Sequence, residues 1–467
     1  MTLNSLRLAS ALLLAGTAAA GLAQSPPQAR TASGPVRGSS EGGVEAFKGV
    51  PFAAPPVARL RWQPPQPVKA WTAPRDATRY AADCMQLPFP SDAAPLGTAP
   101  AEDCLYANVW RPAGVKAGAK LPVLVWIYGG GFVNGGSSPP TYSGAALARQ
   151  GIMVVSFNYR LGRFGTFAHP AIAGTPREVD FGLLDQLAAL RWVQRNVASF
   201  GGDPRAVTII GESAGGMSVH AMLTSPAAKG LFRAAVVQSG GDASYNGASI
   251  ATAEAAATAF SRGKGIATND PQAAAKLYAL TGEQVIDGLN LATVGAQQGL
   301  ERTYSRPVPD GRTFVDSLGA YRAGNFAHVP VMIGATSNDI GGPTGYMMTG
   351  ARTVAGLLAK AGMPTYYYRF DYVATSATTP ETAGAGHATE IPFFFDTADI
   401  KYGAATTATD RAAARVASRY LVNFVKAGGD PNGAGAVPWR RYDANDPAML
   451  TMTRSGGATL APEGERP

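Results

Sequence analysis

The sequence contains few of the residues that bind metals. Its 467 residues include two cysteines and four histidines, the latter at positions 169, 220, 328 and 387, and none of them has the spacing of a metal-ligand set. We therefore expect no metal and no other cofactor. Charged residues make up 15% of the chain, and the net charge of +8 is spread along it without a run of lysine or arginine. This pattern does not favour a nucleic-acid partner.

Apolar runs long enough to cross a membrane are missing after the N-terminus. Residues 1–23 carry one positive charge, Arg7, then a short apolar stretch and small residues with cleavage points near Ala20 and Ala23. They predict a secretory signal peptide. A membrane anchor is the alternative, but the apolar stretch is shorter than the roughly 20 residues that a spanning helix needs. We expect an exported protein, periplasmic or extracellular, without stable membrane insertion. Residues 24–467 then form one domain, although the length would also allow two or three.

The two cysteines, Cys84 and Cys104, are 20 residues apart. In an exported chain we expect them to form a disulfide, because disulfides persist in oxidising compartments. Two reduced thiols are the alternative if the protein stays in the cytosol.

Apolar and β-branched runs of strand length dominate the middle of the chain. They cover residues 121–128, 152–157, 207–210, 234–239, 329–335 and 366–372. Helical segments separate them. The clearest runs from Leu183 to Val197 with apolar residues at spacings of three or four, and others cover 412–429 and the alanine-rich region 248–300. Such runs are typical of an α/β fold, a mostly parallel sheet with helices on both faces. The last dozen residues are expected to be loose.

A serine in a strand-turn-helix pattern is the first candidate for chemistry. Residues 207–223 read VTIIGESAGGMSVHAML, a β-branched run, a turn of small residues around Ser213, and a helix from Gly216. This is the context of a nucleophile elbow, in which small neighbours allow a strained turn that exposes the hydroxyl. The same G-x-S-x-G pattern occurs at Ser40, but there it joins two short strands and no helix follows. We therefore predict that Ser213 is a nucleophile.

A serine hydroxyl is a weak nucleophile and needs a base. His387 lies in the glycine-rich loop ETAGAGHATE after the last strand-like run, and loops at strand ends commonly carry catalytic residues. His220 is seven residues past Ser213 on the same predicted helix, about 10 Å along its axis, which is too far for a hydrogen bond. His169 and His328 precede the best acid candidate. We predict His387 as the base.

The acid should lie between the serine and the histidine, because enzymes with this elbow have the order serine, acid, histidine. Asp339, in VPVMIGATSNDIGG, comes directly after a strand-like run and 48 residues before His387. Asp310 is the competitor, in a predicted turn ahead of that strand. We favour Asp339.

The motif WIYGGGF places a glycine loop after the first long strand-like run. Backbone N–H groups in such a loop can stabilise an oxyanion, together with the N–H after the nucleophile. We predict that Gly130, Gly131 and Ala214 form an oxyanion hole.

These residues stand within a series of blocks that resembles the type-B carboxylesterases, a family that includes bacterial para-nitrobenzyl esterases and the cholinesterases. The blocks occur in the family's order over nearly the whole mature chain, among them FKGVPFAAPPVARLRW, EDCLYANVW, WIYGGGF, NYRLGRFG, GESAGG and GHATEIPFFF. The resemblance implies an α/β-hydrolase fold, serine ester hydrolysis and a disulfide between Cys84 and Cys104. It carries the nucleophile over to Ser213, the base to His387 and the oxyanion donors to Gly130, Gly131 and Ala214.

The chain departs from the family pattern at several places. Tyr128 stands where many members have histidine. The family usually has glutamate in a D-E-G block, whereas this chain has NDIG. An ungapped alignment puts Asp339 at the position of that glutamate, and a one-residue gap puts Ile340 there. Only the aspartate can orient an imidazole. The segment between Asp339 and His387 is shorter than in most members, which predicts a reduced helical cap and a site open to bulky groups. The loop between the cysteines has no tryptophan, so choline esters are not expected.

We therefore expect a serine carboxylesterase acting on a small-molecule ester through an acyl-enzyme. Glu212, beside the nucleophile, either tunes the pocket or serves the turn. A catalytically silent, cholinesterase-like binding or adhesion module is the alternative from another class, and an amidase or acyltransferase could use the same residues. The sequence indicates neither the particular ester nor an oligomeric state.

Overall fold

The computed structural model of the chain describes residues 25–89, 94–172, 174, 178–244, 248–295 and 301–462. The predicted signal peptide, residues 1–23, lies outside the described residues. Within the described ranges, no helix has the length and hydropathy needed to span a membrane.

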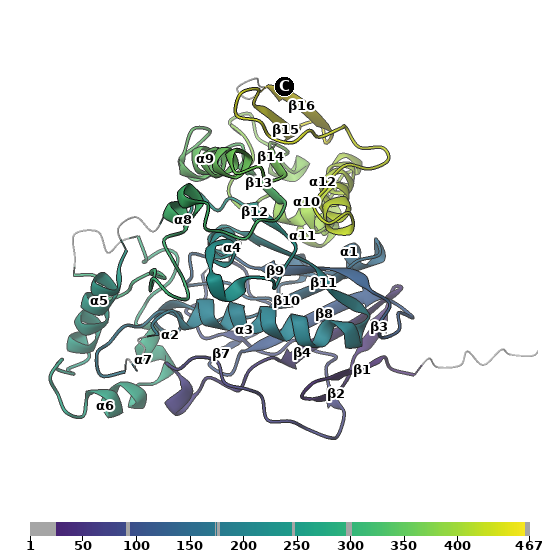
Figure 1. Cartoon of the computed structure of the whole chain (residues 1–467). Helices are drawn as coiled ribbons and strands as arrows, with labels where there is room; N and C mark the ends of the chain where they lie inside the picture. The colour runs from purple at the N-terminus through teal and green to yellow at the C-terminus, as the bar shows by residue number, and fades with distance from the viewer. Residues whose placement is uncertain are drawn as a thin grey trace, which may run out of the picture.

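One large sheet organises the described part of the chain (Figure 1). In spatial order its strands are β16 (Ala458–Pro462), β15 (Ala448–Met452), β14 (Thr365–Phe370), β13 (Val331–Thr336), β12 (Ala234–Gln238), β11 (Gly202–Glu212), β9 (Leu121–Ile127), β10 (Met153–Phe157), β8 (Tyr106–Pro112), β4 (Val44–Pro51) and β3 (Ser39–Glu41). The pairs from β10 through β15 are parallel, while β8, β4 and β3 at one edge and β16 at the other pair antiparallel. The predicted mostly parallel sheet is thus confirmed, with antiparallel edges.

Each of the six predicted strand-like runs forms a strand of this sheet. The central strands are buried on both faces; all residues of β10 and β12 are buried, for example. Burial on both faces explains why these runs are continuously apolar rather than alternating. Among the last dozen residues, 458–462 differ from the expectation, because β16 pairs with β15 there, and residues 463–467 lie outside the described residues.

The described residues also form two small sheets, from strands that lie before and after β3 and β4 in the chain. The first contains β1 (Gln28–Thr31), β2 (Gly34–Arg37) and β5 (Arg75–Asp76), and the second contains β6 (Asp83–Cys84) and β7 (Pro100–Ala101).

Helices cover both faces of the sheet (Figure 1). One face carries α3 (Phe181–Asn196), α4 (Ala214–Thr224), α8 (Ser317–Ala323) and α9 (Tyr346–Lys360); the other carries α1 (Ala145–Arg149), α10 (Ile391–Phe394), α11 (Ala398–Tyr402) and α12 (Ala408–Lys426). Away from the sheet lie α5 (Ile250–Gly263), α6 (Ala273–Ala279) and α7 (Gly282–Ile286), the last beside α2 (Gly162–Gly165). The helix predicted at 183–197 corresponds to α3, whereas the described part of 248–300 contains α5, α6 and α7 with non-helical segments between them. α12 begins at Ala408 rather than at residue 412, because Thr407 caps it through the N–H of Asp410.

The strand order reverses beside β9. From β9 the chain goes to β10 on one side, and it then returns to β11 on the other side. The loops that leave the carboxyl ends of β9 and β11 therefore diverge and leave a crevice between them, which is where open α/β sheets bind ligands. The segments after these two strands contain the GGG loop and Ser213.

The predicted disulfide between Cys84 and Cys104 is confirmed, with both cysteines buried. Close to it, Gln86 supports the GGG loop. Gln86 Oε1 accepts hydrogen bonds from the Gly135 N–H (2.9 Å) and from Asn134 Nδ2 (3.1 Å). The disulfide thus fixes the chain two residues before Gln86, which holds the loop after β9 through Asn134 and Gly135.

Candidate active site

Ser213 occupies a tight turn between β11, which ends at Glu212, and α4, which begins at Ala214. Its backbone has φ 55° and ψ −121°, a conformation that is costly for a residue with a side chain, by about 1–3 kcal/mol. Glycine is required on both sides. A Cβ at Gly211 would lie 2.2 Å from Gly215 O, and one at Gly215 would lie 2.0 Å from Ile127 O. The G-x-S-x-G pattern therefore follows from the packing of this turn.

Three residues that are distant in sequence meet at this turn. His387 Nε2 lies 2.8 Å from Ser213 Oγ, and His387 Nδ1 lies 2.6 Å from Asp339 Oδ1. Asp339 is 4% exposed, whereas the His387 side chain is 23% exposed. The structure thus brings the predicted nucleophile, base and acid into one hydrogen-bonded series that opens to solvent at the histidine.

The Asp339 carboxylate is held from several directions. Oδ2 accepts hydrogen bonds from Ser239 Oγ (2.7 Å), Thr336 Oγ1 (2.8 Å) and the Thr336 N–H (3.2 Å), and Oδ1 also accepts one from the Ile340 N–H (2.7 Å). Burial alone would raise the pKa of Asp339, but the hydrogen bonds from His387 and Ser239 hold it below its usual value. The carboxylate is therefore ionised and fixed in orientation. The sequence predicted neither Ser239 nor Thr336.

The competing candidates lie elsewhere. Asp310 Oδ1 accepts the backbone N–H groups of Arg312, Thr313 and Phe314, which is the turn expected for it. Ile340, the other alignment of the NDIG block, is 52% exposed. Ser40 lies in the β3–β4 hairpin.

The other three histidines also have separate surroundings. The His220 ring is buried, with Nδ1 2.9 Å from the Tyr321 hydroxyl, and the His169 ring pairs with Ser261. His328 Nε2 lies 3.3 Å from Gly324 O on an exposed segment. None of them reaches Ser213 or Asp339.

The GGG loop packs against the turn that carries Ser213. A Cβ added at Gly129 would lie 3.0 Å from the Ser213 Cβ, so the two segments are in close contact. Gly130 and Gly131 have φ 108° and 64°, a backbone that side chains rarely adopt. Among the described residues, the N–H groups of Gly130, Gly131 and Ala214 have no hydrogen-bond acceptor. Three unpaired N–H groups close to the Ser213 turn favour an anion there.

Tyr128, which replaces the family's histidine before the glycines, is buried and stacked on Tyr159 at 4.4 Å between ring centroids. Its hydroxyl donates to Tyr159 O (3.1 Å). This residue therefore holds the end of β9 in place.

Two further carboxylates surround His387. Glu212 is 3% exposed, with Oε1 3.4 Å from His387 Nε2, and Glu390 is completely buried. Burial raises the pKa of Glu212 to about 7 against the opposing charge of His387, and burial raises the pKa of Glu390 well above its usual range. Burial disfavours the charged form of His387, but the negative charges of Glu212 and Asp339 outweigh that effect and raise its pKa to about 9. Glu390, three residues after the histidine, was not among the residues predicted from the sequence.

We expect replacement of Glu212 by glutamine to lower the pKa of His387. The glutamine keeps the shape of the side chain but removes the negative charge that stabilises the imidazolium. With four histidines in the chain, the pKa can be read from the pH dependence of the imidazole C–H signals in NMR spectra. His387 should titrate above its ordinary 6.5 in the wild type and at lower pH in Glu212→Gln. His328, on the exposed segment, serves as the internal control; an unchanged His387 pKa would show that Glu212 serves only the turn.

Among the described residues, no three histidine, cysteine, aspartate or glutamate side chains are grouped so that they could hold a metal ion.

The sheet, its switch point and the serine turn define an α/β-hydrolase fold. Among solved structures, that of a PNB esterase superposes with a TM-score of 0.82, at 29% identity, over 94% of this chain and 97% of that chain. The model of the carboxylesterase family matches residues 25–351 and 344–463. The chain belongs to the carboxylesterase family.

Two curated relatives show how far this similarity extends. The chain is 41% identical over 324 residues to a fumonisin B1 esterase of Sphingopyxis macrogoltabida, covering 66% of this chain and 55% of that protein. It is 39% identical over 315 residues to the para-nitrobenzyl esterase of Bacillus subtilis (strain 168), covering 66% of this chain and 62% of that protein. These matches thus span less than two thirds of either relative's length.

Proposed function

We propose that the protein is a serine carboxylesterase that hydrolyses small-molecule carboxylic esters through an acyl-enzyme. The observation that carries this proposal is the series of short contacts from Ser213 Oγ through His387 to Asp339 Oδ1. A hydroxyl hydrogen-bonded to an imidazole, which is itself oriented by a carboxylate, is the arrangement that activates a serine. Membership of the carboxylesterase family, with relatives named as esterases, favours an ester as the substrate.

In the proposed acylation step, Ser213 attacks the ester carbonyl carbon while His387 Nε2 takes the hydroxyl proton. The carbonyl π electrons move to oxygen, and the resulting oxyanion accepts hydrogen bonds from the N–H groups of Gly130, Gly131 and Ala214. Collapse of this intermediate expels the alcohol, which receives its proton from the imidazolium.

In the deacylation step, His387 takes a proton from water, and the hydroxide attacks the acyl carbon. Collapse returns the proton to Ser213 and releases the carboxylic acid. Asp339 keeps the Nδ1 proton in place throughout and stabilises the imidazolium in both steps.

We also propose that residues 1–23 are a signal peptide and that residues 24–467 act as one exported domain. The disulfide between Cys84 and Cys104 supports an oxidising destination. Between Asp339 and His387 the chain forms only α9, β14 and a short 3-10 helix at Thr375–Ala377. This short segment supports a reduced cap and a site open to bulky ester groups.

A fluorophosphonate probe tests the proposed function. We expect one equivalent of probe per chain to react with Ser213, with mass spectrometry placing the adduct on its peptide, and p-nitrophenyl acetate turnover to fall in proportion. A catalytically silent binding module would give neither adduct nor turnover. An amidase or acyltransferase would react with the probe but prefer an anilide substrate, or transfer the acyl group to an added alcohol rather than to water.

A further inference from the structure

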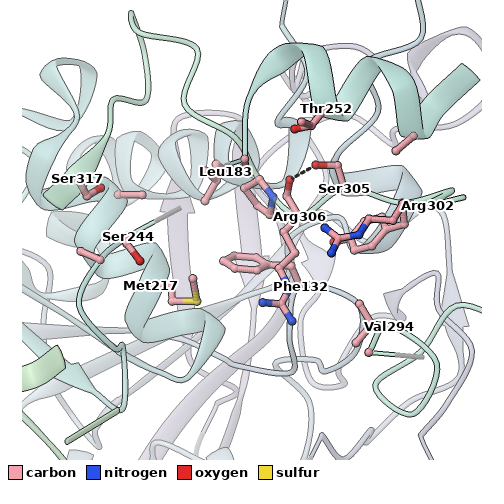
Figure 2. Close-up of a pocket in the computed structure, with 17 residues that line it drawn as sticks. Phe132, Leu183, Met217, Ser244, Thr252, Val294, Arg302, Ser305, Arg306 and Ser317 are labelled. Atoms are coloured by element: carbon pink, nitrogen blue, oxygen red, sulfur yellow. Dashed lines mark hydrogen bonds between the residues drawn. The ribbon is translucent and has the colours of Figure 1, made fainter. Parts of the chain in front are cut away.

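A cavity of about 380 Å³ is lined by residues that are close in sequence to the proposed nucleophile and oxyanion glycines (Figure 2). Its lining includes Met217, one helical turn beyond Ser213, whose N–H donates to Ser213 O (2.9 Å), and Phe132, which directly follows the two proposed oxyanion glycines. The opposite wall comes from α5 and from the segment at 302–307. A group attached to an ester held at Ser213 could therefore extend into this cavity.

The cavity wall has a net positive charge. Arg302 and Arg306 both line it, and no aspartate or glutamate is among its lining residues. Figure 2 shows their guanidinium groups in the part of the cavity that also contains Phe132 and Val294. The lining is otherwise composed of apolar residues, small hydroxyl side chains and Tyr304.

Arg302 and Arg306 also lack the partners that neighbouring arginines have. Arg262, on α5, pairs with Glu301, and Arg312 pairs with Glu178. Within the described ranges, neither Arg302 nor Arg306 forms an ion pair or donates a side-chain hydrogen bond. No described residue therefore competes with a bound anion for their donors.

The wall segment that carries both arginines is fixed near each end. Arg163, itself buried, donates to Thr303 O (2.8 Å) and Thr303 Oγ1 (2.7 Å), and Asp180, also buried, accepts the Val308 N–H (3.1 Å). Between these anchors, Tyr304 is buried against the cavity. Arg302 and Arg306 thus extend from a braced backbone, which lowers the entropy lost when they bind a ligand.

We propose that this cavity binds a carboxylate of the substrate, so that the enzyme prefers esters that carry a free carboxylate on the acyl or the alcohol part. A guanidinium presents parallel N–H donors that match the two oxygens of a carboxylate. Both arginines are exposed, so the attraction acts close to solvent and weakens as salt is added. The same charges oppose cationic alcohols. The inference rests on the proposed esterase function, and it adds the class of ester.

Two pairs of matched esters test the preference and locate the carboxylate. On the acyl side, monobenzyl succinate is compared with benzyl 4-methylpentanoate, in which a branched alkyl group of similar shape replaces the carboxylate. On the alcohol side, 4-(acetoxymethyl)benzoate is compared with 4-isopropylbenzyl acetate. Released alcohol is measured chromatographically at low ionic strength. We expect the wild type to have the higher kcat/KM with the anionic member of at least one pair, and the pair concerned identifies the part that enters the cavity.

Arg302→Gln and Arg306→Gln should each lower kcat/KM for the preferred anionic ester about tenfold, mainly through KM, and change the neutral ester less than twofold. Arg205→Gln is the control, because this substitution removes the same charge at a place remote from the cavity. The Arg205 side chain is 80% exposed and lies near the start of β11. The carboxylate site would be wrong if the wild type hydrolysed neutral esters as well as anionic ones. It would also be wrong if the variants lost equal activity with both esters. Either result would leave the esterase function intact. Failure to hydrolyse any of the four esters would instead count against the proposed function.

Discussion

Replacement of Ser213 by alanine is expected to lower kcat for p-nitrophenyl acetate by roughly 10⁴- to 10⁶-fold. The variant lacks the oxygen that forms the acyl-enzyme, and water would have to attack directly from the space left by the hydroxyl. The remaining rate should reflect the backbone N–H groups and substrate binding alone. Steady-state hydrolysis and loss of the fluorophosphonate adduct both measure the change. Alanine lacks the Oγ but has the same backbone constraints, so the variant should fold.

The matched control is Ser40→Ala, because Ser40 has the same G-x-S-x-G surroundings in sequence but lies in the β3–β4 hairpin. We expect this variant to hydrolyse p-nitrophenyl acetate at the wild-type rate. If Ser213→Ala retained more than a tenth of the activity, the nucleophile assignment would be wrong.

The contrast between Ser40 and Ser213 shows what the sequence could predict. Both serines fit the pattern, and only the flanking strand and helix distinguished them. The central strands could also be predicted, because strands that are buried on both faces have a continuous apolar sequence. Asp339 and His387 could be chosen because strand ends converge at one edge of a parallel sheet.

Other site residues depend on which strands are neighbours. Ser239 donates a hydrogen bond to Asp339 because it directly follows β12, which pairs with β13. Which strands pair could not be predicted from the sequence. Glu390 could have been noticed from its position three residues after His387. The burial of Glu390 could not have been predicted, because a glutamate is rarely found in a protein interior. Arg302 and Arg306 look like ordinary solvated residues in the sequence, and only their position in the cavity distinguishes them.

Buried carboxylates make the environment of His387 more negative than a single acid partner would. Glu212, Asp339 and Glu390 all raise its pKa, and burial opposes them. A base with a raised pKa is protonated over a wider pH range, so kcat/KM should rise with pH as His387 loses its proton. The imidazolium formed during acylation is stabilised by the same charges.

Replacement of Asp339 by asparagine is expected to lower kcat by about 10⁴-fold, because it changes the imidazole tautomer. The Oδ2 position receives donors from Ser239 and from both the N–H and hydroxyl of Thr336. Three donors at the Oδ2 position outnumber the Ile340 N–H at the Oδ1 position, so the asparagine oxygen should take the Oδ2 position and turn its NH₂ group toward His387 Nδ1. Nδ1 must then accept, the proton moves to Nε2, and Nε2 can no longer take the proton of Ser213. Hydrolysis of p-nitrophenyl acetate and the imidazole ¹⁵N shifts measure the two effects.

Asp310→Asn is the control for this substitution, since Asp310 was the competing acid and instead accepts three backbone N–H groups in a turn. It should cost some stability, measured by thermal unfolding, and leave kcat nearly unchanged. A loss of kcat in Asp310→Asn with retention in Asp339→Asn would reverse the assignment. Retention in both variants would transfer the orienting role to Glu212 or Glu390, the other carboxylates whose charges act on His387. Two backbone donors that cannot rotate away compete for the asparagine oxygen, the Thr336 N–H at the Oδ2 position and the Ile340 N–H at the Oδ1 position, and the imidazole ¹⁵N shifts show which of them the oxygen accepts.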